Sequence, residues 1–289
     1  MSTAEVARDM ELMRRAVGDK KLTYLGFSYG TYLGQVYANM FPTRFRAVAV
    51  DGVLDPVAWA GDKSNVDQPL ELRLNSSGGA AKVLREILVR CDRVGGAKCR
   101  FAAGDPVANT QLIGERLRAA PVVIEDEEFG ESFTFTYQDL VGSMLSALYD
   151  PAGYQYIVDM LADLYVLTEP PSPSARSTGS RDADAARRLA ALHRTAPTRS
   201  RAAARAGASP TTTASTRSPR SPAPTRERPP RAASSPAYAA QADERANYFG
   251  RLWLWGTSVC AGDAFTGDDE DAYTGPFDTK TTSAGAGRG

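Results

Sequence analysis

The stretch LTYLGFSYGTYLGQVYANMFP, residues 22–42, places a serine between two glycines where the hydrophobic pattern changes. Residues 21–27 form an apolar run of strand length, whereas residues 29–40 carry apolar side chains at helical spacing and are soon followed by a proline. Residues 26–30 (GFSYG) fit G-x-S-x-G, the pattern of a nucleophile elbow, which turns sharply from strand to helix. The pattern predicts that Ser28 is a catalytic nucleophile.

The predicted chemistry needs more than the serine. A serine hydroxyl is a weak nucleophile at neutral pH, so it requires a base to accept its proton and donors to hold the oxyanion. Gly26 and Gly30 would let strand and helix approach closely, and the backbone N–H of Tyr29 would be one oxyanion donor. We therefore expect a catalytic Ser28, an oxyanion hole with Tyr29, and an elbow formed by Gly26 and Gly30. The alternative is a serine in a tight turn of an unrelated α/β protein.

The elements around the elbow predict a parallel α/β sheet. A capping box of Ser2 and Glu5 begins a helix before the first strand. The apolar face of that helix is expected to comprise Val6, Met10, Met13 and Val17. The first strand is expected to be buried on both faces, and residues 45–50 (FRAVAV) form a second buried strand. Helix, strand, helix and strand in this order are typical of an α/β protein.

Beyond residue 60 the pattern becomes mostly helical, with one strand-like interruption around residues 122–137. No further β-α alternation follows, so this block predicts a helical cap over the sheet. The helices expected in it are Leu70–Val89, Tyr137–Leu148 and Ala152–Leu167. A last amphipathic helix is expected over Tyr238–Trp255, in which Trp253 and Trp255 are packing residues, and a flexible tail follows it.

The chain has a formal net charge of +0, but this average hides a local excess of arginine. Residues 171–235 contain 13 arginines, no lysine and three acidic residues, and their only large aliphatic side chains are Leu189 and Leu192. A segment with so little apolar surface cannot offset the entropy lost on ordering. We therefore expect it to be disordered.

Three cysteines leave at least one unpaired. Cys91 and Cys99 flank the loop RVGGAK and could form a disulfide in an oxidising compartment, or they could be two unrelated thiols. No spacing typical of a zinc site occurs, so neither a metal nor another cofactor is expected. No apolar run is long enough for a membrane span, and the amino terminus lacks the apolar core of a signal peptide.

The sequence GFSYGTYLGQVYANMFPTRFRAVAVDGVLDP closely resembles the nucleophile region of the tripeptidyl-aminopeptidase-like branch of the α/β-hydrolases, in the prolyl-aminopeptidase (S33) group. The segments TAEVARDMELMRRAVGDKKLTYL, YFGRLWLWGTSVCAG and YTGPFDTKT are similar to the same family. The resemblance covers roughly residues 1–167 and 236–282. It implies an exported serine exopeptidase that removes short peptides or single residues from the amino termini of peptide substrates.

The chain also departs from this family. The resemblance implies an acid and a base downstream of the segment similar to GPFDTKT, and earlier strands with a second oxyanion donor, and we expect this chain to lack all of these. The only histidine, His193, falls in the arginine-rich segment, where a chance histidine is the favoured interpretation. Asp51 and Asp55 are better interpreted as turn residues than as the catalytic acid. We therefore expect little or no turnover.

The expected fold class is α/β: an α/β-hydrolase core with an incomplete parallel sheet, a mostly helical cap and a long disordered segment. The expected divisions are a partial core over 1–60, the cap over 61–167, the disordered segment over 168–235, and a helix and tail over 236–289.

The arginine-rich segment interrupts family-like sequence that later resumes. One hypothesis is that residues 170–235 and 283–289 are frame-shifted translation, because Arg, Ala, Pro, Ser, Thr and Gly are what GC-rich DNA tends to encode out of frame. The competing hypothesis is a genuine arginine-rich linker that binds nucleic acid or an acidic surface electrostatically. No aromatic residues are interleaved with the arginines, so nucleic-acid binding is not expected.

The predicted function is that of a serine hydrolase, an exopeptidase acting on peptide amino termini through an acyl-enzyme at Ser28. The alternatives are a non-catalytic remnant and an esterase or lipase on the same fold. Oligomeric state and compartment are left open.

Overall fold

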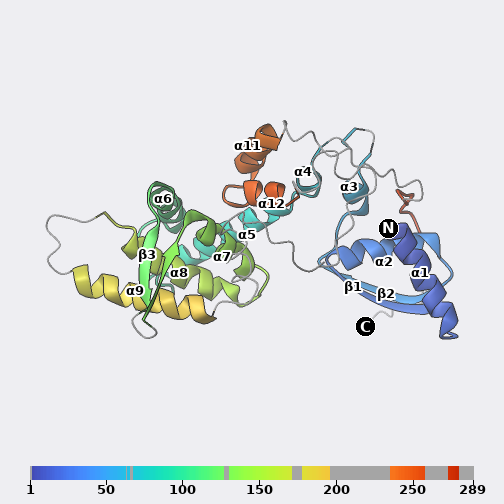
Figure 1. The fold of residues 1–289 in the computed structure, drawn as a ribbon, viewed down its shortest axis with the longest axis horizontal. Helices are drawn as coiled ribbons and strands as arrows, with labels where there is room; N and C mark the ends of the chain where they lie inside the picture. Colours follow the sequence, from blue (N-terminus) through green and yellow to red (C-terminus); the bar gives the residue numbers. More distant parts are fainter. Residues whose placement is uncertain are drawn as a thin grey trace. The chain divides into compact units, whose positions relative to one another are not determined.

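The computed structural model describes residues 2–62, 64–65, 68–126, 130–170, 178–195, 235–257 and 273–279. The chain divides into two compact units (Figure 1), and each is described by itself. Unit 1 comprises residues 1–76, 215–245 and 250–289, and unit 2 comprises residues 77–214 and 246–249.

Unit 1 is built around two parallel strands. Its amino-terminal elements are α1 (Thr3–Ala16), β1 (Leu22–Phe27), α2 (Tyr29–Met40) and β2 (Phe45–Asp51). β1 pairs with β2 so that Phe27 lies opposite Asp51. Helices α1 and α2 lie over one face of the pair, in blue in Figure 1. The α/β alternation predicted from the sequence is therefore present.

The prediction that β1 is buried on both faces is wrong for the described structure. Leu25 and Phe27 are 63% and 61% exposed, and the burial pattern of β1 alternates along the strand. Side chains alternate between the faces of a sheet, so one set packs towards α2 while the other faces away from the covering helices. An apolar run of this kind is typical of a strand that is buried on both faces in a larger parallel sheet. Here the same run belongs to a sheet of two strands.

Helix α1 begins as predicted but buries only part of the expected face. Ser2 and Glu5 form the capping box, with the Glu5 N–H donating to the Ser2 hydroxyl. In contrast, Met13 and Val17 are 60% and 75% exposed. The buried side of α1 consists of Thr3, Ala4, Ala7 and Arg14. Met10 of the expected face does pack, partly buried, against the core cluster that contains Ala7, so the buried face overlaps the expected one and excludes Met13 and Val17.

A carboxylate on α1 joins this helix to α2. Glu11 accepts a hydrogen bond from the Arg14 Nε at 2.8 Å and another from the Tyr37 hydroxyl at 2.9 Å. The bond from Arg14, followed by that from Tyr37, lowers the pKa of Glu11 to about 2 against the opposing effect of burial. Tyr37 is fully buried in the core of unit 1, so Glu11 satisfies a polar group that the core encloses.

We predict that Glu11 makes the stability of unit 1 depend on acid pH. Its pKa is lower in the folded chain than its ordinary value of 4.5, so its stabilisation is complete above that value and is lost as the pH falls towards 2. Glu11→Gln should therefore lower stability near neutral pH and flatten its dependence between about pH 5 and pH 2. Urea unfolding across this range measures both effects. Asp9→Asn on the same helix is the control, and an equal flattening in that variant would contradict the prediction.

The remaining described parts of unit 1 are short helices and one extended segment. The helices are α3 (Pro56–Ala60), α4 (Leu70–Leu74), α11 (Ser235–Arg245) and most of α12 (Phe249–Thr257). The extended segment, residues 273–279, packs against α2: Thr279 donates from its N–H and hydroxyl to the Asn39 side chain at 3.0 and 2.6 Å. The carboxyl-terminal piece therefore lies against the helix that follows Ser28.

Two helices expected to be continuous are broken. Residues expected to form one helix over Leu70–Val89 form α4 and α5 (Ser76–Val94), because Asn75 adopts the left-handed conformation at φ 54°. Similarly, Tyr248 has φ 74° and separates α11 from α12. Asparagine is a known helix-ending residue that the periodicity of the apolar residues outweighed here, whereas a tyrosine carries no such signal.

Unit 2 is mostly helical, as predicted for this block. Its elements are α5, α6 (Pro106–Ala119), β3 (Val122–Asp126), β4 (Glu131–Phe135), α7 (Tyr137–Ala147), α8 (Gly153–Leu167) and α9 (Thr178–Thr195). The expected strand-like interruption is the antiparallel pair β3 and β4. The core consists of fully buried apolar side chains that include Ile113, Leu140, Met144, Ile157 and Leu161.

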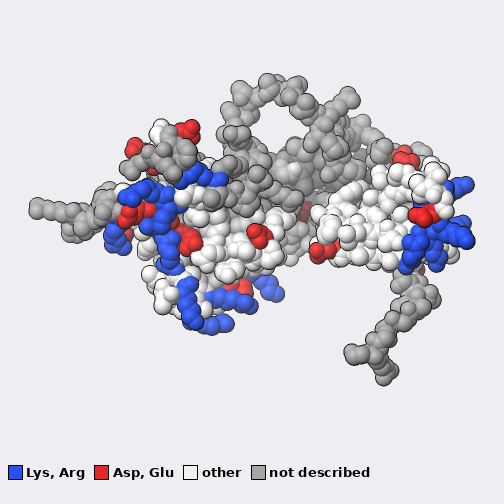
Figure 2. Space-filling view, turned by 90° about the horizontal axis from the view of Figure 1, so that it is seen from below, with Lys and Arg blue, Asp and Glu red and all other residues white. Residues whose placement is uncertain are grey.

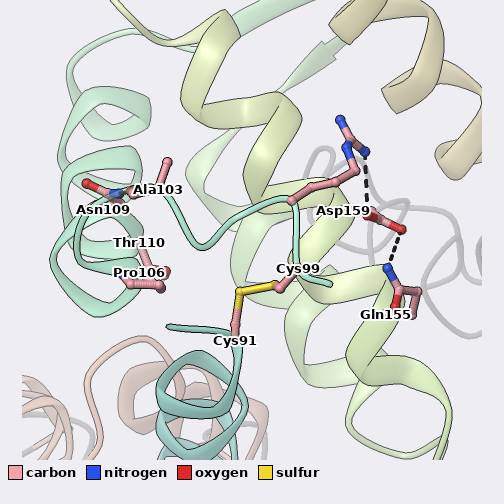
Figure 3. The surroundings of a disulfide bond; sticks show 9 residues. Cys91, Cys99, Ala103, Pro106, Asn109, Thr110, Gln155 and Asp159 are labelled. Atoms are coloured by element: carbon pink, nitrogen blue, oxygen red, sulfur yellow. Dashed lines mark hydrogen bonds and ion pairs between the residues drawn. A yellow bond between two sulfur atoms is a disulfide. The ribbon is translucent and has the colours of Figure 1, made fainter. Parts of the chain in front are cut away.

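A disulfide joins Cys91 and Cys99 in unit 2 (Figure 3), which decides between the two alternatives left open by the sequence. Cys91 lies on α5 and Cys99 on the loop that follows it, and their Cα atoms are 5.4 Å apart. The third cysteine, Cys260, lies outside the described residues.

The structure differs from the expected disordered segment at Thr178–Thr195, which forms α9. Ala185, Leu189 and Ala190 are at most 1% exposed, and the helix packs against α8 and β3. The apolar stripe of α9 is narrow. The composition of the whole segment, in which arginines and small residues dominate, therefore did not reveal it. The other residues of the expected segment that the structure describes are 168–170 and Ser235, the first residue of α11, and residues 171–177 and 196–234 lie outside the described parts.

A buried carboxylate fixes α9 to α8. Asp163 is 0% exposed, and its Oδ1 accepts hydrogen bonds from the Arg188 Nε at 2.9 Å and from Arg100 at 2.6 Å. Breaking one side of a buried ion pair leaves a charge without compensation, which is costly. Arg188 therefore ties part of the arginine-rich segment to the folded unit.

We predict that Leu189→Ala destabilises unit 2 by about 2–4 kcal/mol, the usual cost of truncating a fully buried leucine. Arg187→Ala on the same helix should change the free energy of unfolding by less than about 0.5 kcal/mol, because the Arg187 side chain is 59% exposed. Urea unfolding of both variants tests the packing of α9. Equal stability of Leu189→Ala and the parent chain would show that α9 does not pack as described.

Basic side chains mark one end of the two-stranded sheet. Lys20 and Lys21 precede β1, Arg44 precedes β2, and all three are exposed. Lys and Arg side chains gather over unit 1 at the right of Figure 2. Ser28 follows the carboxyl end of β1, so the three basic residues and the serine belong to opposite ends of the strands.

Across the described residues, the helices are too short or too polar to cross a membrane.

Candidate active site

Ser28 lies in a sharp turn between β1 and α2, in a backbone conformation that non-glycine residues rarely adopt. Its φ is 52° and its ψ is −122°, and it is solvent-exposed. Such a conformation costs about 1–3 kcal/mol and persists only when the surroundings hold it. The Ser28 side chain makes no capping hydrogen bond to α2. This is the strand-turn-helix context in which a G-x-S-x-G pattern presents a serine hydroxyl at the edge of a sheet.

Backbone hydrogen bonds hold the turn on both sides. The Ser28 N–H donates to the Asp51 carbonyl at 3.1 Å, which extends the pairing of β1 and β2 by one step. The Ser28 carbonyl accepts from the Thr31 N–H at 2.9 Å and from the Thr31 hydroxyl at 2.7 Å. The serine is therefore fixed through its main chain, while its side chain is left out of these contacts.

Thr31 is a positioning residue that sequence reasoning missed. Its hydroxyl donates to the Ser28 carbonyl and accepts from the Leu54 N–H at 2.9 Å, so one buried side chain joins the elbow to the loop after β2. Gln35 adds a second link, because its amide donates to the Thr31 and Leu54 carbonyls at 3.1 and 3.0 Å. A threonine near a helix start is common, so the sequence held no distinctive signal for this role.

Gly26 is required by a close approach of two backbones. A Cβ at this position would lie 2.5 Å from the Gly30 carbonyl oxygen, which is too short for any real contact. Gly34 makes room for the Tyr24 ring, whose Cε1 would lie 2.5 Å from a Cβ there. The Tyr24 hydroxyl in turn donates to the Gly30 carbonyl at 2.6 Å. Gly26, Gly30 and Gly34 therefore make the space that the Tyr24 side chain occupies. Their spacing of four residues was the sequence signal that could have revealed the role of Tyr24.

The predicted oxyanion donor, Tyr29, is the first residue of α2. Its backbone N–H therefore belongs to the helix start, where amide groups carry the positive end of the helix dipole. The Tyr29 side chain is engaged elsewhere and is not expected to act as an oxyanion donor, because its hydroxyl shares a hydrogen bond of 2.7 Å with the Thr3 hydroxyl. Burial raises the pKa of the Tyr29 hydroxyl despite that bond.

Aromatic rings surround the side chain of Tyr29. Its ring centroid lies 5.8 Å from that of Trp59 and 6.3 Å from that of Tyr32, and Tyr32 lies 6.1 Å from Phe277. Burial raises the pKa of Tyr32 to about 12, so its hydroxyl stays protonated across the ordinary pH range. The start of α2 is thus packed against apolar and neutral groups from three separate segments of unit 1.

The acidic residues after β2 are engaged in local structure. The Asp51 side chain accepts the Gly52 N–H at 2.8 Å, and Gly52 has φ 65°, as in a tight turn. The Asp55 side chain caps α3 by accepting from the N–H groups of Val57 and Ala58 at 2.8 and 3.2 Å. These contacts agree with the interpretation of both residues as turn residues.

The structure places His193, the only histidine of the sequence, on α9 of unit 2. Its ring is stacked on that of Phe133 in β4, with centroids 4.4 Å apart and an interplanar angle of 17°. His193 was expected in a disordered segment, but it lies on a helix and contacts an aromatic ring. Ser28 belongs to unit 1, so the structure does not bring the two together within one unit.

Trp253 and Trp255, both predicted to be packing residues, differ in how far they are buried. Trp253 is half-buried on α12 and its indole Nε1 is enclosed without a hydrogen-bond partner, whereas Trp255 is 45% exposed. No group of three or more His, Cys, Asp or Glu side chains that could hold a metal ion occurs among the described residues.

We predict that Gly26→Ala and Gly30→Ala differ sharply. The first places a Cβ against backbone and should destabilise unit 1 by about 2 kcal/mol or more. The second meets only the Tyr24 hydroxyl, at 3.4 Å, and should change the free energy of unfolding by less than about 1 kcal/mol. Thermal or urea unfolding of the pair provides the measurement. Similar losses in both variants would exclude the tight approach at Gly26.

Comparisons with known proteins point to the same segment. The family model of the α/β hydrolase fold matches residues 1–74, which include α1, β1, α2 and β2. The fold class predicted from the sequence is thus confirmed: this segment has the α/β hydrolase fold, and most of the other described elements are helical.

Relatives of this chain include named hydrolases. Serine protease Hip1 of Mycobacterium tuberculosis is 31% identical over 169 residues, which cover 57% of this chain and 30% of Hip1. Tripeptidyl aminopeptidase of Streptomyces lividans is 54% identical over 56 residues, or 19% of this chain and 10% of the relative. Putative hydrolase YuaR of Escherichia coli is 45% identical over 51 residues, or 18% and 10%. The match to this chain spans less than a third of each relative's length.

Proposed function

We propose that unit 1 carries the nucleophile of a serine hydrolase active site, with Ser28 as the nucleophile and the Tyr29 N–H as one oxyanion donor. The observation that carries the proposal is the backbone of Ser28: φ 52°, directly between a strand and a helix, with the turn held through main-chain hydrogen bonds. The family-model match over residues 1–74 and the relatives named serine protease and tripeptidyl aminopeptidase support it.

The substrate class we propose is the amino-terminal end of peptides, cleaved through an acyl-enzyme. Its support is the resemblance to the S33 group and the 54% identity to tripeptidyl aminopeptidase over 56 residues. An esterase is the alternative on the same fold. Aminoacyl and tripeptidyl p-nitroanilides, tested beside p-nitrophenyl esters, separate the two classes, because only a peptidase cleaves the anilides efficiently.

We further propose that this chain by itself turns over slowly. The support is that the sequence has a single histidine, His193, which lies outside the segment matched by the hydrolase family model and whose ring is stacked on Phe133. Without a base, a serine nucleophile loses a factor of about 10⁶ in rate, by analogy with triad deletions in subtilisin. The chain would then retain the elbow geometry with little of its catalytic power.

A fluorophosphonate probe tests the second part of this proposal. We expect labelling of the folded chain to be no faster than labelling of a Ser28→Ala variant, because no base activates the hydroxyl. Faster labelling that is lost in Ser28→Ala but kept in Ser64→Ala would mean that a base is present and that the chain is competent. His193→Ala would then report whether His193 supplies it.

A thiol substitution tests the elbow without needing a base. A cysteine at the tip of an elbow, next to a helix start, should have a lowered pKa and react with iodoacetamide up to about tenfold faster at pH 7 than an ordinary exposed thiol. In a Cys260→Ser background, Ser28→Cys should therefore react faster than Ala49→Cys at an exposed position of β2, with mass mapping to identify the modified residue. Equal rates would contradict the proposed oxyanion-stabilising environment.

A further inference from the structure

The end of unit 1 opposite Ser28 carries basic side chains that the proposed hydrolase chemistry does not use. This end comprises the last turn of α1 and the starts of β1 and β2, and we call it the basic end. Its exposed basic residues are Arg15, Lys20, Lys21, Arg44 and Arg46. Lys and Arg side chains gather over this unit in Figure 2. The basic end is therefore a candidate surface for an anionic partner.

Hydrogen bonds hold the starts of the two strands side by side. The Leu22 N–H donates to the Arg44 carbonyl at 2.7 Å, so Lys21 and Arg44 belong to neighbouring strand starts. One residue further along, the Arg46 guanidinium donates to the Thr23 hydroxyl at 2.9 Å across the sheet. The basic residues before β1 and those around the start of β2 therefore form one surface.

The turn between α1 and β1 brings the end of the helix to the same surface. The Asp19 N–H donates to the Arg14 carbonyl at 3.1 Å, and the Arg14 side chain donates to the Asp19 carbonyl. The hydrogen bond from Arg14 is the main cause of the lowered pKa of Glu11, and the charge of Arg44 adds to it. Arg44 therefore lies near the end of α1, whereas Arg14 and Glu11 form an ion pair that adds no net charge.

The acidic residues near the basic end are too few to neutralise it. Asp19 is exposed in the turn before β1, and Asp278 is exposed beside Thr279, which is bonded to the last turn of α2. Further up α1, Arg8 and Asp9 are both exposed and their charges cancel. Five exposed basic residues therefore stand against two acidic ones, and the surface is positive.

Exposed apolar side chains lie directly beside the basic end, on the last turns of α1. Leu12, Met13 and Val17 are 58%, 60% and 75% exposed. With about 100° between successive residues, these three share one side of the helix with Ala16, which is also exposed. Apolar side chains on a helix beside a group of basic ones are typical of surfaces that lie in the headgroup region of an anionic bilayer.

The combination favours a lipid surface over a nucleic acid. The phosphates of a nucleic acid would pair with the basic residues but leave Met13 and Val17 in water, whereas a bilayer offers both anionic headgroups and hydrocarbon. Among the described residues of the basic end, no exposed aromatic ring is available to stack on a base.

We propose that the basic end docks unit 1 on an anionic phospholipid surface. Its lysines and arginines pair with the lipid phosphates, each contributing about fivefold to the affinity, while Met13 and Val17 enter the boundary between headgroups and acyl chains. β1 is six residues long, or about 20 Å, so Ser28 lies at the end of unit 1 that faces away from the bilayer. The inference does not depend on whether Ser28 is catalytic.

The first experiment measures cosedimentation of the full chain with vesicles of phosphatidylglycerol and phosphatidylcholine in equal parts. The double variant Lys20→Glu and Lys21→Glu should bind more than about tenfold more weakly. The control, Lys82→Glu with Arg85→Glu on α5, makes the same change in net charge and should lose less than about twofold.

The comparison of these two variants carries the test, because residues 171–235 are also rich in arginine and are present in both. Equal losses would overturn the assignment of the surface, and so would the absence of vesicle binding by the parent chain. All four positions are exposed, so the fold should be retained, which circular dichroism checks.

A second pair of variants separates a lipid partner from other polyanions. Met13→Ser with Val17→Ser should weaken vesicle binding about fivefold but leave binding to heparin, which has sulfates and no hydrocarbon, unchanged. Val83→Ser with Val107→Ser, at exposed positions of unit 2, is the control and should change neither. Vesicle binding that is insensitive to Met13 and Val17 would overturn the proposal. So would loss of duplex DNA binding in the lysine variant with vesicle binding unchanged, because the partner would then be a nucleic acid.

A fluorescent label tests which end of unit 1 meets the bilayer. In a Cys260→Ser background, acrylodan on Val17→Cys should shift its emission to the blue on anionic vesicles, because the label enters an apolar environment. The same label on Val57→Cys, an exposed position on α3 after the carboxyl end of β2, should not shift. Equal shifts at the two positions would contradict the proposed orientation.

Discussion

The close approach of two backbones at Gly26 and Gly30 is the constraint on which unit 1 depends. A β-carbon at position 26 would lie 2.5 Å from a carbonyl oxygen of the following helix, so strand and helix can meet only if that residue is glycine. Once they meet, the chain has to reverse within one residue, and Ser28 absorbs the reversal with a positive φ. The direction of α2 relative to β1 and the exposure of the Ser28 side chain follow from this contact.

The cost of the strained serine is offset by specific hydrogen bonds rather than by burial. The Ser28 N–H donates to the Asp51 carbonyl and the Ser28 carbonyl accepts from the Thr31 N–H, so both sides of the residue are fixed, and the Thr31 hydroxyl extends this support to the loop after β2. Each such bond contributes about 1 kcal/mol, which is comparable with the cost of the conformation. The side chain itself takes no part, so the geometry would persist whatever residue the position carried, provided that it tolerated the backbone.

Sequence patterns predicted the parts of the fold that local chemistry determines. The elbow between β1 and α2, the capping box at Ser2 and the strand pair around residues 122–137 follow from glycine placement, hydrogen-bonding side chains and alternation. The patterns did not predict the breaks at Asn75 and Tyr248, where the backbone takes a left-handed conformation without a glycine. The exposure of Leu25 and Phe27 was also missed, because a strand's composition does not reveal which neighbours cover it.

The site could be predicted in part for the same reason. Ser28, Tyr29 and the two glycines are consecutive or nearly so, and a short motif is enough to propose them; their catalytic roles stay predictions. Thr31 acts through a contact that depends on the folded position of Leu54 and leaves no mark in a motif, whereas the role of Tyr24 left a signal, the spacing of Gly26, Gly30 and Gly34, that the G-x-S-x-G pattern covers only in part. The hypothesis of a shifted reading frame also stays a prediction, although α9, inside the segment concerned, packs like an ordinary helix.

That packing limits how far the chain can be trimmed. A protein ended at residue 170 to remove its arginine-rich part would also lose α9, and with it the two hydrogen bonds that Arg188 donates to the Asp163 carboxylate, whereas the bond from Arg100 would remain. The surface of α8 that Leu189 and Ala190 now shield would meet water. For expression or crystallisation, a carboxyl-terminal boundary placed before Thr195 would therefore remove a packed helix of unit 2.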